Sequence, residues 1–233
     1  MKLNIGAGQF QHDDWTNVDH ASAWYGDRLA PHVEWDATSG EPLPFADGSA
    51  ECVYTSHLIE HLERRHVAAM FSEAYRVLAP DGVLRVTAPD AELLHHAATF
   101  ADPKWWAWQD AWFQHAGVRP EDATVLDRLV REIATPRCRW VAKTDWSEPI
   151  ARLFHELERD TFLDALCGGL VYDPGHPGDH ITWWGERRVA EAMVEAGFGC
   201  VYSSRRGQSM RIDMRTVDMT LGWASLYVEA INV

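Results

Sequence analysis

Two glycines near the N-terminus form the first pattern that could support chemistry. They follow a short apolar run in the sequence Asn4-Ile5-Gly6-Ala7-Gly8. Glycines at such a place let the backbone approach a ligand closely at the carboxyl end of a parallel strand. A dinucleotide-binding fingerprint would need a third glycine where Gln11 stands, and a phosphate-binding loop would need a Gly-Lys-Ser/Thr ending that is absent. A plain glycine-rich turn is the alternative.

Carboxylates close the next two predicted strands. Asp19 ends the second strand and Asp36 ends the third. The first could accept hydrogen bonds from two ribose hydroxyls, and the second could accept one from an adenine amino group. Either aspartate could instead cap a helix or a turn.

Four histidines are candidates for acid–base chemistry. His57 follows the fourth predicted strand and His61 lies one turn later, while His176 and His180 flank a Pro-Gly loop. A histidine near neutrality suits a general base, so we predict His57, and after it His180, as catalytic residues. Packing against the next helix is the alternative for His57. His176, Asp179 and His180 are competent metal ligands, but their spacing matches no zinc signature, so no metal ligand is predicted.

Aromatic and basic residues in the second half could line a second pocket. Trp183 and Trp184 follow the His176–His180 loop, and Arg152 could pair with a carboxylate or phosphate. Aromatic faces would suit a flat or cationic ligand, although tryptophans within a helix more often pack a core. We predict His176, His180, Trp183, Trp184 and Arg152 as substrate-binding residues.

Alternating strands and helices must position these side chains. The apolar runs predict the strands Lys2–Gly6, Thr16–Asp19, Val33–Asp36, Glu51–Ser56 and Val83–Ala88. Val67, Met70, Phe71, Ala74 and Leu78 recur at helical spacing, and Ala79-Pro80-Asp81-Gly82 predicts the turn that follows.

The rest of the chain predicts a helical insertion and a return to the sheet. Helix-like pieces lie at Glu92–Phe100, Trp105–His115, Ala123–Ile133 and Ile150–Leu166, within a cap at about residues 91–184. A helix over Glu186–Ala196 ends at Gly197. The strands Cys200–Arg206 and Leu221–Ala230 should pair antiparallel, because their connection is too short for a crossover helix.

Composition excludes several classes of protein. The 233 residues suit one domain with a substantial core, and the formal net charge of −14 disfavours nucleic acid as a partner. No apolar run is long enough for a membrane span or a signal peptide, so we expect a cytoplasmic protein with no membrane partner. Four scattered cysteines suggest neither a zinc ribbon nor a disulfide framework.

Several motifs in the same order resemble the class I S-adenosylmethionine (SAM)-dependent methyltransferases, in a branch with a short first loop. They are Asn4-Ile5-Gly6-Ala7-Gly8, Asn17-Val18-Asp19, Leu43-Pro44-Phe45, Ser56-His57-Leu58-Ile59-Glu60-His61-Leu62, Arg76-Val77-Leu78-Ala79-Pro80-Asp81-Gly82 and Glu195-Ala196-Gly197-Phe198. The resemblance covers residues 1 to about 90 and resumes at Trp184–Phe198. It implies an α/β fold: a Rossmann-like sheet of seven strands with the last antiparallel, here carrying a helical cap.

The resemblance also implies roles for individual residues. Gly6 and Gly8, with Ala7, would pass beneath the methionine part of SAM, Asp19 would hold the ribose, and Asp36 with Ala37 would lie by the adenine. Ser56 and His57 would flank the sulfonium. The cofactor-binding set is therefore Asn4, Gly6, Ala7, Gly8, Asp19, His20, Asp36, Ala37, Ser56, His57 and His61.

Two departures from the family pattern concern the first strand. Asn4 stands where the family usually has an acidic residue, and about ten residues join the first two strands, too few for the usual covering helix. The cap or a second subunit must supply part of the wall around SAM, so a homodimer is one option.

The predicted function is methyl transfer from SAM to oxygen or nitrogen of a small metabolite, with specialised natural-product biosynthesis as one setting. Two alternatives stay open. One is a SAM-binding member of the fold that does not methylate. The other is an NAD-dependent oxidoreductase, which the absence of glycine at position 11 disfavours.

Overall fold

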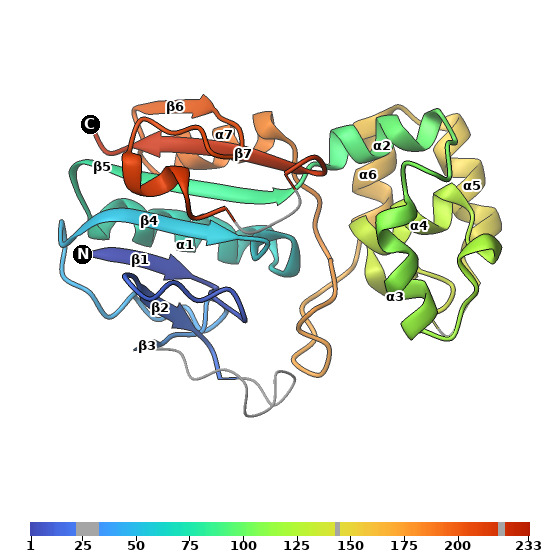
Figure 1. Cartoon of the computed structure of the whole chain (residues 1–233), viewed down its shortest axis with the longest axis horizontal. Helices are drawn as coiled ribbons and strands as arrows, with labels where there is room; N and C mark the ends of the chain where they lie inside the picture. Colours follow the sequence, from blue (N-terminus) through green and yellow to red (C-terminus); the bar gives the residue numbers. More distant parts are fainter. Residues whose placement is uncertain (22–32, 143–144, 219–221) are drawn as a thin grey trace.

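A seven-stranded sheet forms the body of the molecule (Figure 1). The structure is a computed structural model that describes residues 1–21, 33–142, 145–218 and 222–233. The strand order is β3-β2-β1-β4-β5-β7-β6; the first five strands run parallel, and β7 is antiparallel to both β5 and β6. This topology confirms the predicted Rossmann-like sheet with its last strand antiparallel.

The strands lie close to their predicted positions. They are β1 (Lys2–Ile5), β2 (Thr16–Asp19), β3 (Val33–Glu34), β4 (Ala50–Ser56), β5 (Leu78–Pro89), β6 (Cys200–Ser203) and β7 (Ser225–Ile231). The predicted start of the last strand, at residue 221, lies outside the described residues.

The turn predicted at residues 79–82, between the helix and the next strand, is wrong. These residues belong to β5, where the register with β4 shifts between Ala50 and Cys52. Asp81 takes a positive φ of 63°, and its backbone N–H donates to the carbonyl of Asn232 at 2.8 Å. The residues therefore form an irregularity within one long strand, because the C-terminal segment supplies partners for their backbone.

Two helices, α1 (Arg64–Val77) and α7 (Glu186–Glu195), cover one face of the sheet (Figure 1). The buried stripe of α1 contains Val67, Met70, Phe71 and Ala74, as their spacing predicted. Gly197 follows α7 with a positive φ of 114°, which suits the end of a helix.

The opposite face of the sheet is covered mainly by a loop over residues 204–218. Met214, on the short 3-10 helix η6 (Ile212–Arg215), packs with Trp15 and Tyr54. Residues 6–15, between β1 and β2, contain turns and no helix. The missing first covering helix is thus confirmed, and its place is taken by chain from the other end of the sequence.

A buried arginine ties this loop to the sheet. Arg85 of β5 is 0% exposed, and its Nε and Nη2 donate to the two carboxylate oxygens of Asp218 at 2.9 and 2.6 Å. Its Nη1 donates to Glu229 of β7 and to the carbonyl of Gln208, and Nη2 also donates to the carbonyl of Arg205. All the donor atoms of the guanidinium are therefore engaged, and two buried carboxylates depend on it.

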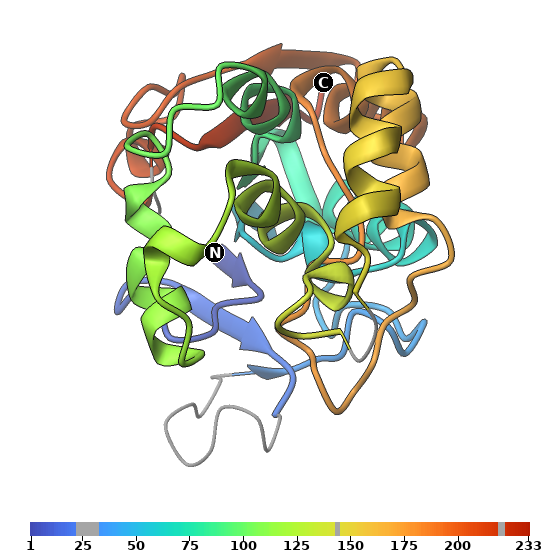
Figure 2. The ribbon, with the colours of Figure 1, turned by 90° about the vertical axis from the view of Figure 1, so that its right-hand side faces the viewer.

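A helical cap stands at the carboxyl ends of the parallel strands (Figures 1 and 2). Its helices are α2 (Ala91–Thr99), α3 (Asp110–His115), α4 (Val125–Ile133), α5 (Ser147–Glu156) and α6 (Arg159–Cys167), with 3-10 turns η3 (Ala107–Gln109), η4 (Pro120–Asp122) and η5 (Thr135–Arg137). The predicted helix at residues 105–115 consists of the 3-10 turn η3 followed by α3. The one at residues 150–166 is split at Leu157 and Glu158, which are extended.

The cap has a hydrophobic core of its own, in which Trp106, Phe162 and Trp183 are buried. The predicted helical insertion is confirmed as an element of the fold. None of the helices among the described residues is long and apolar enough to span a membrane.

Candidate functional site

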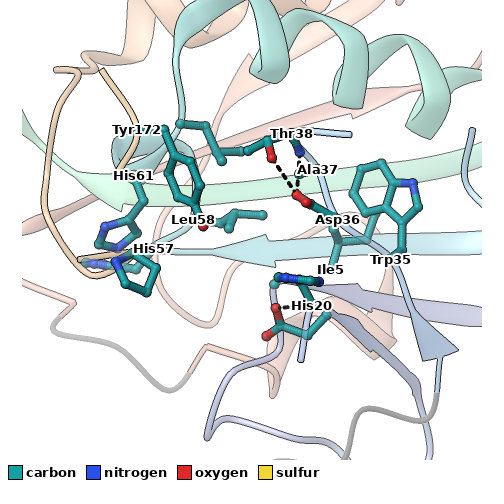
Figure 3. Close-up of a pocket in the computed structure, with 14 residues that line it drawn as sticks. Ile5, His20, Trp35, Asp36, Ala37, Thr38, His57, Leu58, His61 and Tyr172 are labelled. Atoms are coloured by element: carbon teal, nitrogen blue, oxygen red, sulfur yellow. Dashed lines mark hydrogen bonds between the residues drawn. The ribbon is translucent and has the colours of Figure 1, made fainter. Parts of the chain in front are cut away.

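A cavity opens where the carboxyl ends of the central strands meet the loop that returns from the cap (Figure 3). Its lining consists of Ile5, Gly6, Asp19, His20, Trp35, Asp36, Ala37, Thr38, His57, Leu58, His61, Leu62, Tyr172 and Pro177. The space between these residues, with the part open to solvent included, is about 650 Å³.

The glycine turn after β1 forms one wall of this cavity. Gly6 and Gly8 have positive φ angles of 68° and 47°, which favour glycine. A Cβ at Gly6 would lie 2.7 Å from a methyl group of Leu58, another lining residue. The turn therefore needs glycine both for its backbone conformation and for the close approach of Leu58.

Asp19, at the end of β2, is held by the same turn. Its Oδ2 accepts a hydrogen bond from the backbone N–H of Gly8 at 2.6 Å, and its Oδ1 accepts one from the N–H of His20 at 2.7 Å. Burial raises the pKa of this carboxyl above its ordinary value, although the two N–H donors partly offset the effect. Each oxygen can still accept a second hydrogen bond, so the carboxylate suits a pair of ligand hydroxyls.

Asp36, after β3, is fixed by a tight turn. Its Oδ1 accepts hydrogen bonds from the N–H and the hydroxyl of Thr38 at 2.7 and 2.8 Å (Figure 3). Trp35 is held beside it by a hydrogen bond from its indole Nε1 to the carbonyl of Glu41. The turn places Asp36 and Ala37 in the cavity wall across from the histidines.

His57 lies at the other end of the cavity, directly after β4. It takes a positive φ of 52°, and its N–H donates to the carbonyl of Thr87 at 2.9 Å. Its Nε2 lies 2.9 Å from the hydroxyl of Ser225, and its Nδ1 lies 3.2 Å from Oε1 of Glu60. A His–Glu pair of this kind can orient an imidazole and stabilise its protonated form.

Glu60 is the most deeply buried acid near the cavity. Its side chain is only 3% exposed, and it lies on the 3-10 helix η2 (Ile59–His61). Burial alone would raise its pKa, but the facing His57, together with His61 and His180, outweighs burial and lowers the pKa to about 2. The same contact outweighs burial at His57 and raises the pKa of that imidazole. Glu60 is therefore a carboxylate at neutral pH.

His61 and His180 lie against each other beside Glu60. Their ring centroids are 4.7 Å apart, and His61 Nδ1 lies 3.1 Å from the carbonyl of Asp179. His180 Nδ1 bonds the carbonyl of Glu132 on α4, and burial is the main cause that lowers the pKa of His180 to about 3. The segment after β4, the loop before α7 and the cap helix α4 thus meet here, where the imidazoles of His57, His61 and His180 surround the Glu60 carboxylate.

The comparisons with known proteins agree with this architecture. Residues 14–86 match a protein family described as a methyltransferase domain. These residues are therefore similar to a methyltransferase domain. The family match ends at β5, before the cap begins.

Solved structures of methyltransferases resemble this one only distantly. The apo SAM-dependent methyltransferase SibL shares 13% identity at a TM-score of 0.44, over 99% of this chain and 49% of that protein. A possible histamine N-methyltransferase from Thermotoga maritima shares 12% sequence identity at a TM-score of 0.46, over 100% of this chain and 82% of that protein. Human N-acetylserotonin methyltransferase in complex with SAM shares 10% sequence identity at a TM-score of 0.44, over 99% of this chain and 46% of that protein. The chain thus spans about half the length of SibL. No curated protein sequence matches it.

The structure brings most of the predicted cofactor-binding residues to the cavity. Its lining includes Gly6, Asp19, His20, Asp36, Ala37, His57 and His61. Ala7, Gly8 and Ser56 are not part of the lining, although Gly8 holds Asp19. Asn4 is buried behind the glycine turn, and its amide donates to the carbonyl of Phe10 and to Oδ1 of Asn17, both at 2.9 Å.

None of the predicted substrate-binding residues lines this cavity. Trp183 is buried in the cap core, and Trp184 in the sheet core donates to the carbonyl of Ile59 at 3.0 Å. Arg152 is exposed on α5. His176 lies in an adjacent hollow that shares His61 and Tyr172 with the cavity.

Some lining residues were missed by the sequence prediction. Trp35 and Thr38 flank Asp36, so their proximity in sequence was a usable signal. Tyr172 comes from the loop after the cap, where no motif marks it (Figure 3). Only the tertiary structure brings it to this cavity.

Proposed function

We propose that this protein transfers the methyl group of SAM to an oxygen or nitrogen atom of a small metabolite, as in natural-product biosynthesis. The observation that carries the proposal is the layout of one cavity. Asp19 and Asp36 lie on one side of it, and His57 and His61 lie on the other.

The cofactor half follows from the positions of the two aspartates. Asp19 accepts from both ribose hydroxyls, and Asp36 with Ala37 lies by the adenine, while the methionine part runs over Gly6. Cofactor and acceptor would then meet near His57. The formal charge of −14 supports a small acceptor over a polyanion.

The transfer itself is an in-line displacement at the sulfonium methyl group. Orientation and exclusion of water supply much of the rate enhancement of such a step. When the acceptor carries a proton, His57 accepts it at Nε2, with Glu60 orienting the ring through Nδ1. In the structure Nε2 lies 2.9 Å from the Ser225 hydroxyl, so the ring must give up this contact to reach an acceptor.

Release of S-adenosylhomocysteine tests this function. The purified protein is incubated with SAM and separate panels of phenols, aliphatic alcohols and amines. We expect S-adenosylhomocysteine above the acceptor-free background with one of these classes. Tight SAM binding with no release in any panel would favour a non-methylating member of the fold.

The variant His57→Asn should lower turnover by about 10²–10⁴-fold and change the Kd for SAM by less than about threefold, because a positioned base contributes that much to rate. Asparagine tolerates the positive φ of this position, so the backbone is kept. Steady-state kinetics and SAM titration measure the two effects. His155→Gln, exposed on α5, is the control. Unchanged turnover in His57→Asn would remove this residue from the mechanism.

A further inference from the structure

Three side chains of metal-ligand type converge beside the cavity. One carboxylate oxygen of Glu60 and one ring nitrogen each of His61 and His180 all lie within 4.8 Å of one another. Ligand atoms around a cation with bonds of about 2.0–2.2 Å lie roughly 3–4 Å apart. The three groups would therefore need to close by about 1 Å to share one ion.

The hydrogen bonds of both histidines leave the same ring nitrogen available. A carbonyl oxygen can only accept, so the Nδ1 of His61 facing the Asp179 carbonyl and the Nδ1 of His180 facing the Glu132 carbonyl must carry the protons. Each Nε2 then bears a lone pair. Histidine ligands of metals are oriented in this way by a carbonyl or carboxylate on their other nitrogen.

Glu60 supplies an unsatisfied negative charge between them. Within the described residues, neither of its carboxylate oxygens accepts a hydrogen bond of good geometry. His57 Nδ1 lies 3.2 Å from Oε1, and His61 Nε2 lies 4.0 Å from the same oxygen. A bound cation would give these buried oxygens the direct partner that they lack.

We propose that Glu60, His61 and His180 bind a divalent transition-metal ion, of the Zn²⁺ or Mn²⁺ type, at the histidine end of the cavity. Two imidazoles and one carboxylate suit such ions. Three protein ligands leave coordination positions for water or an acceptor, as in catalytic rather than structural metal sites. His61 also lines the cavity, so the ion lies at its edge.

The role of the ion rests on the proposed function. An acceptor hydroxyl held at the ion would pass its proton to His57 Nε2 through an intervening water molecule, because that nitrogen points toward Ser225 and away from Glu60. The resulting oxygen forms a bond to the methyl carbon while the carbon–sulfur bond breaks, and its electron pair stays on sulfur as neutral S-adenosylhomocysteine. No other reactant is required. Oxygen acceptors are favoured over amines, because a cation activates a bound hydroxyl by lowering its pKa.

Metal binding is tested without any acceptor. The full chain, stripped with EDTA, is titrated with ZnCl₂ and with MnCl₂ by calorimetry, and bound metal is measured after dialysis. We expect one equivalent of at least one of these ions per chain. Glu60→Gln should weaken its binding by at least 10–100-fold, the loss typical even of supporting residues around a metal. His115→Ala, exposed on α3, should bind like the unchanged protein.

Two further measurements keep the outcome decisive. His61→Ala replaces a partly exposed ligand and serves if Glu60→Gln does not fold. SAM titration of the same samples separates loss of the metal site from loss of the cofactor site. The absence of binding by either ion, or equal binding in both ligand variants, would overturn the proposal while leaving the methyltransferase assignment intact.

Discussion

Replacing Arg85 with methionine should lower the free energy of unfolding by about 3–5 kcal/mol, because removing one partner of a buried ion pair leaves the other uncompensated. Here two carboxylates are left, since Asp218 and Glu229 are 2% and 0% exposed at the side chain. Urea unfolding followed by tryptophan fluorescence measures the loss.

The control for this prediction is a charge on the surface. Arg187→Ala removes a side chain that is 67% exposed on α7 and should leave the urea midpoint almost unchanged. A second variant, with methionine at position 85 and leucine at both acidic positions, should recover part of the stability, as apolar replacements of whole buried ion clusters do. A loss below about 1 kcal/mol in Arg85→Met would show that the loop over residues 204–218 is held by its apolar contacts instead.

The variant Asp19→Ala should raise the Kd for SAM by at least about 10–100-fold. Hydrogen bonds to a charged acceptor contribute about 1.5–3 kcal/mol each, and two ribose hydroxyls would lose their partner. The glycine turn would also lose the bond from the N–H of Gly8. Calorimetric titration measures the change, with circular dichroism to establish folding.

A control removes the same charge from the loop that precedes β2. Asp14→Asn changes an exposed aspartate between β1 and β2 and should leave SAM affinity within about twofold. Unchanged affinity in a folded Asp19→Ala protein would mean that the ribose is held elsewhere.

The sheet could be predicted because its signals are local. Apolar runs placed β1, β2 and β4 within a residue or two, and helical spacing placed α1 and α7. The antiparallel end of the sheet followed from a connection too short for a crossover. The irregularity at Asp81 could not be predicted from the local sequence, because its backbone partners come from the far end of the chain.

The site was less predictable because its groups come from distant segments. Asp19 ends β2 and Asp36 lies two residues after β3, so their arrival at one cavity could be expected. His180 looks like a loop residue in the sequence, yet it is buried between His61 and the cap helix α4. Trp183 and Trp184 were predicted as pocket residues because they follow the same loop. Long-range packing instead buries them in two different cores.

Titration of the purified protein with SAM, S-adenosylhomocysteine and NAD tests the central assignment most directly. We predict micromolar binding of the two sulfur nucleosides and none of NAD, because the turn at Gly6 and Gly8 lacks the third glycine while Asp19 and Asp36 line the cavity. Binding of NAD in preference to SAM, or of none of the three, would contradict it.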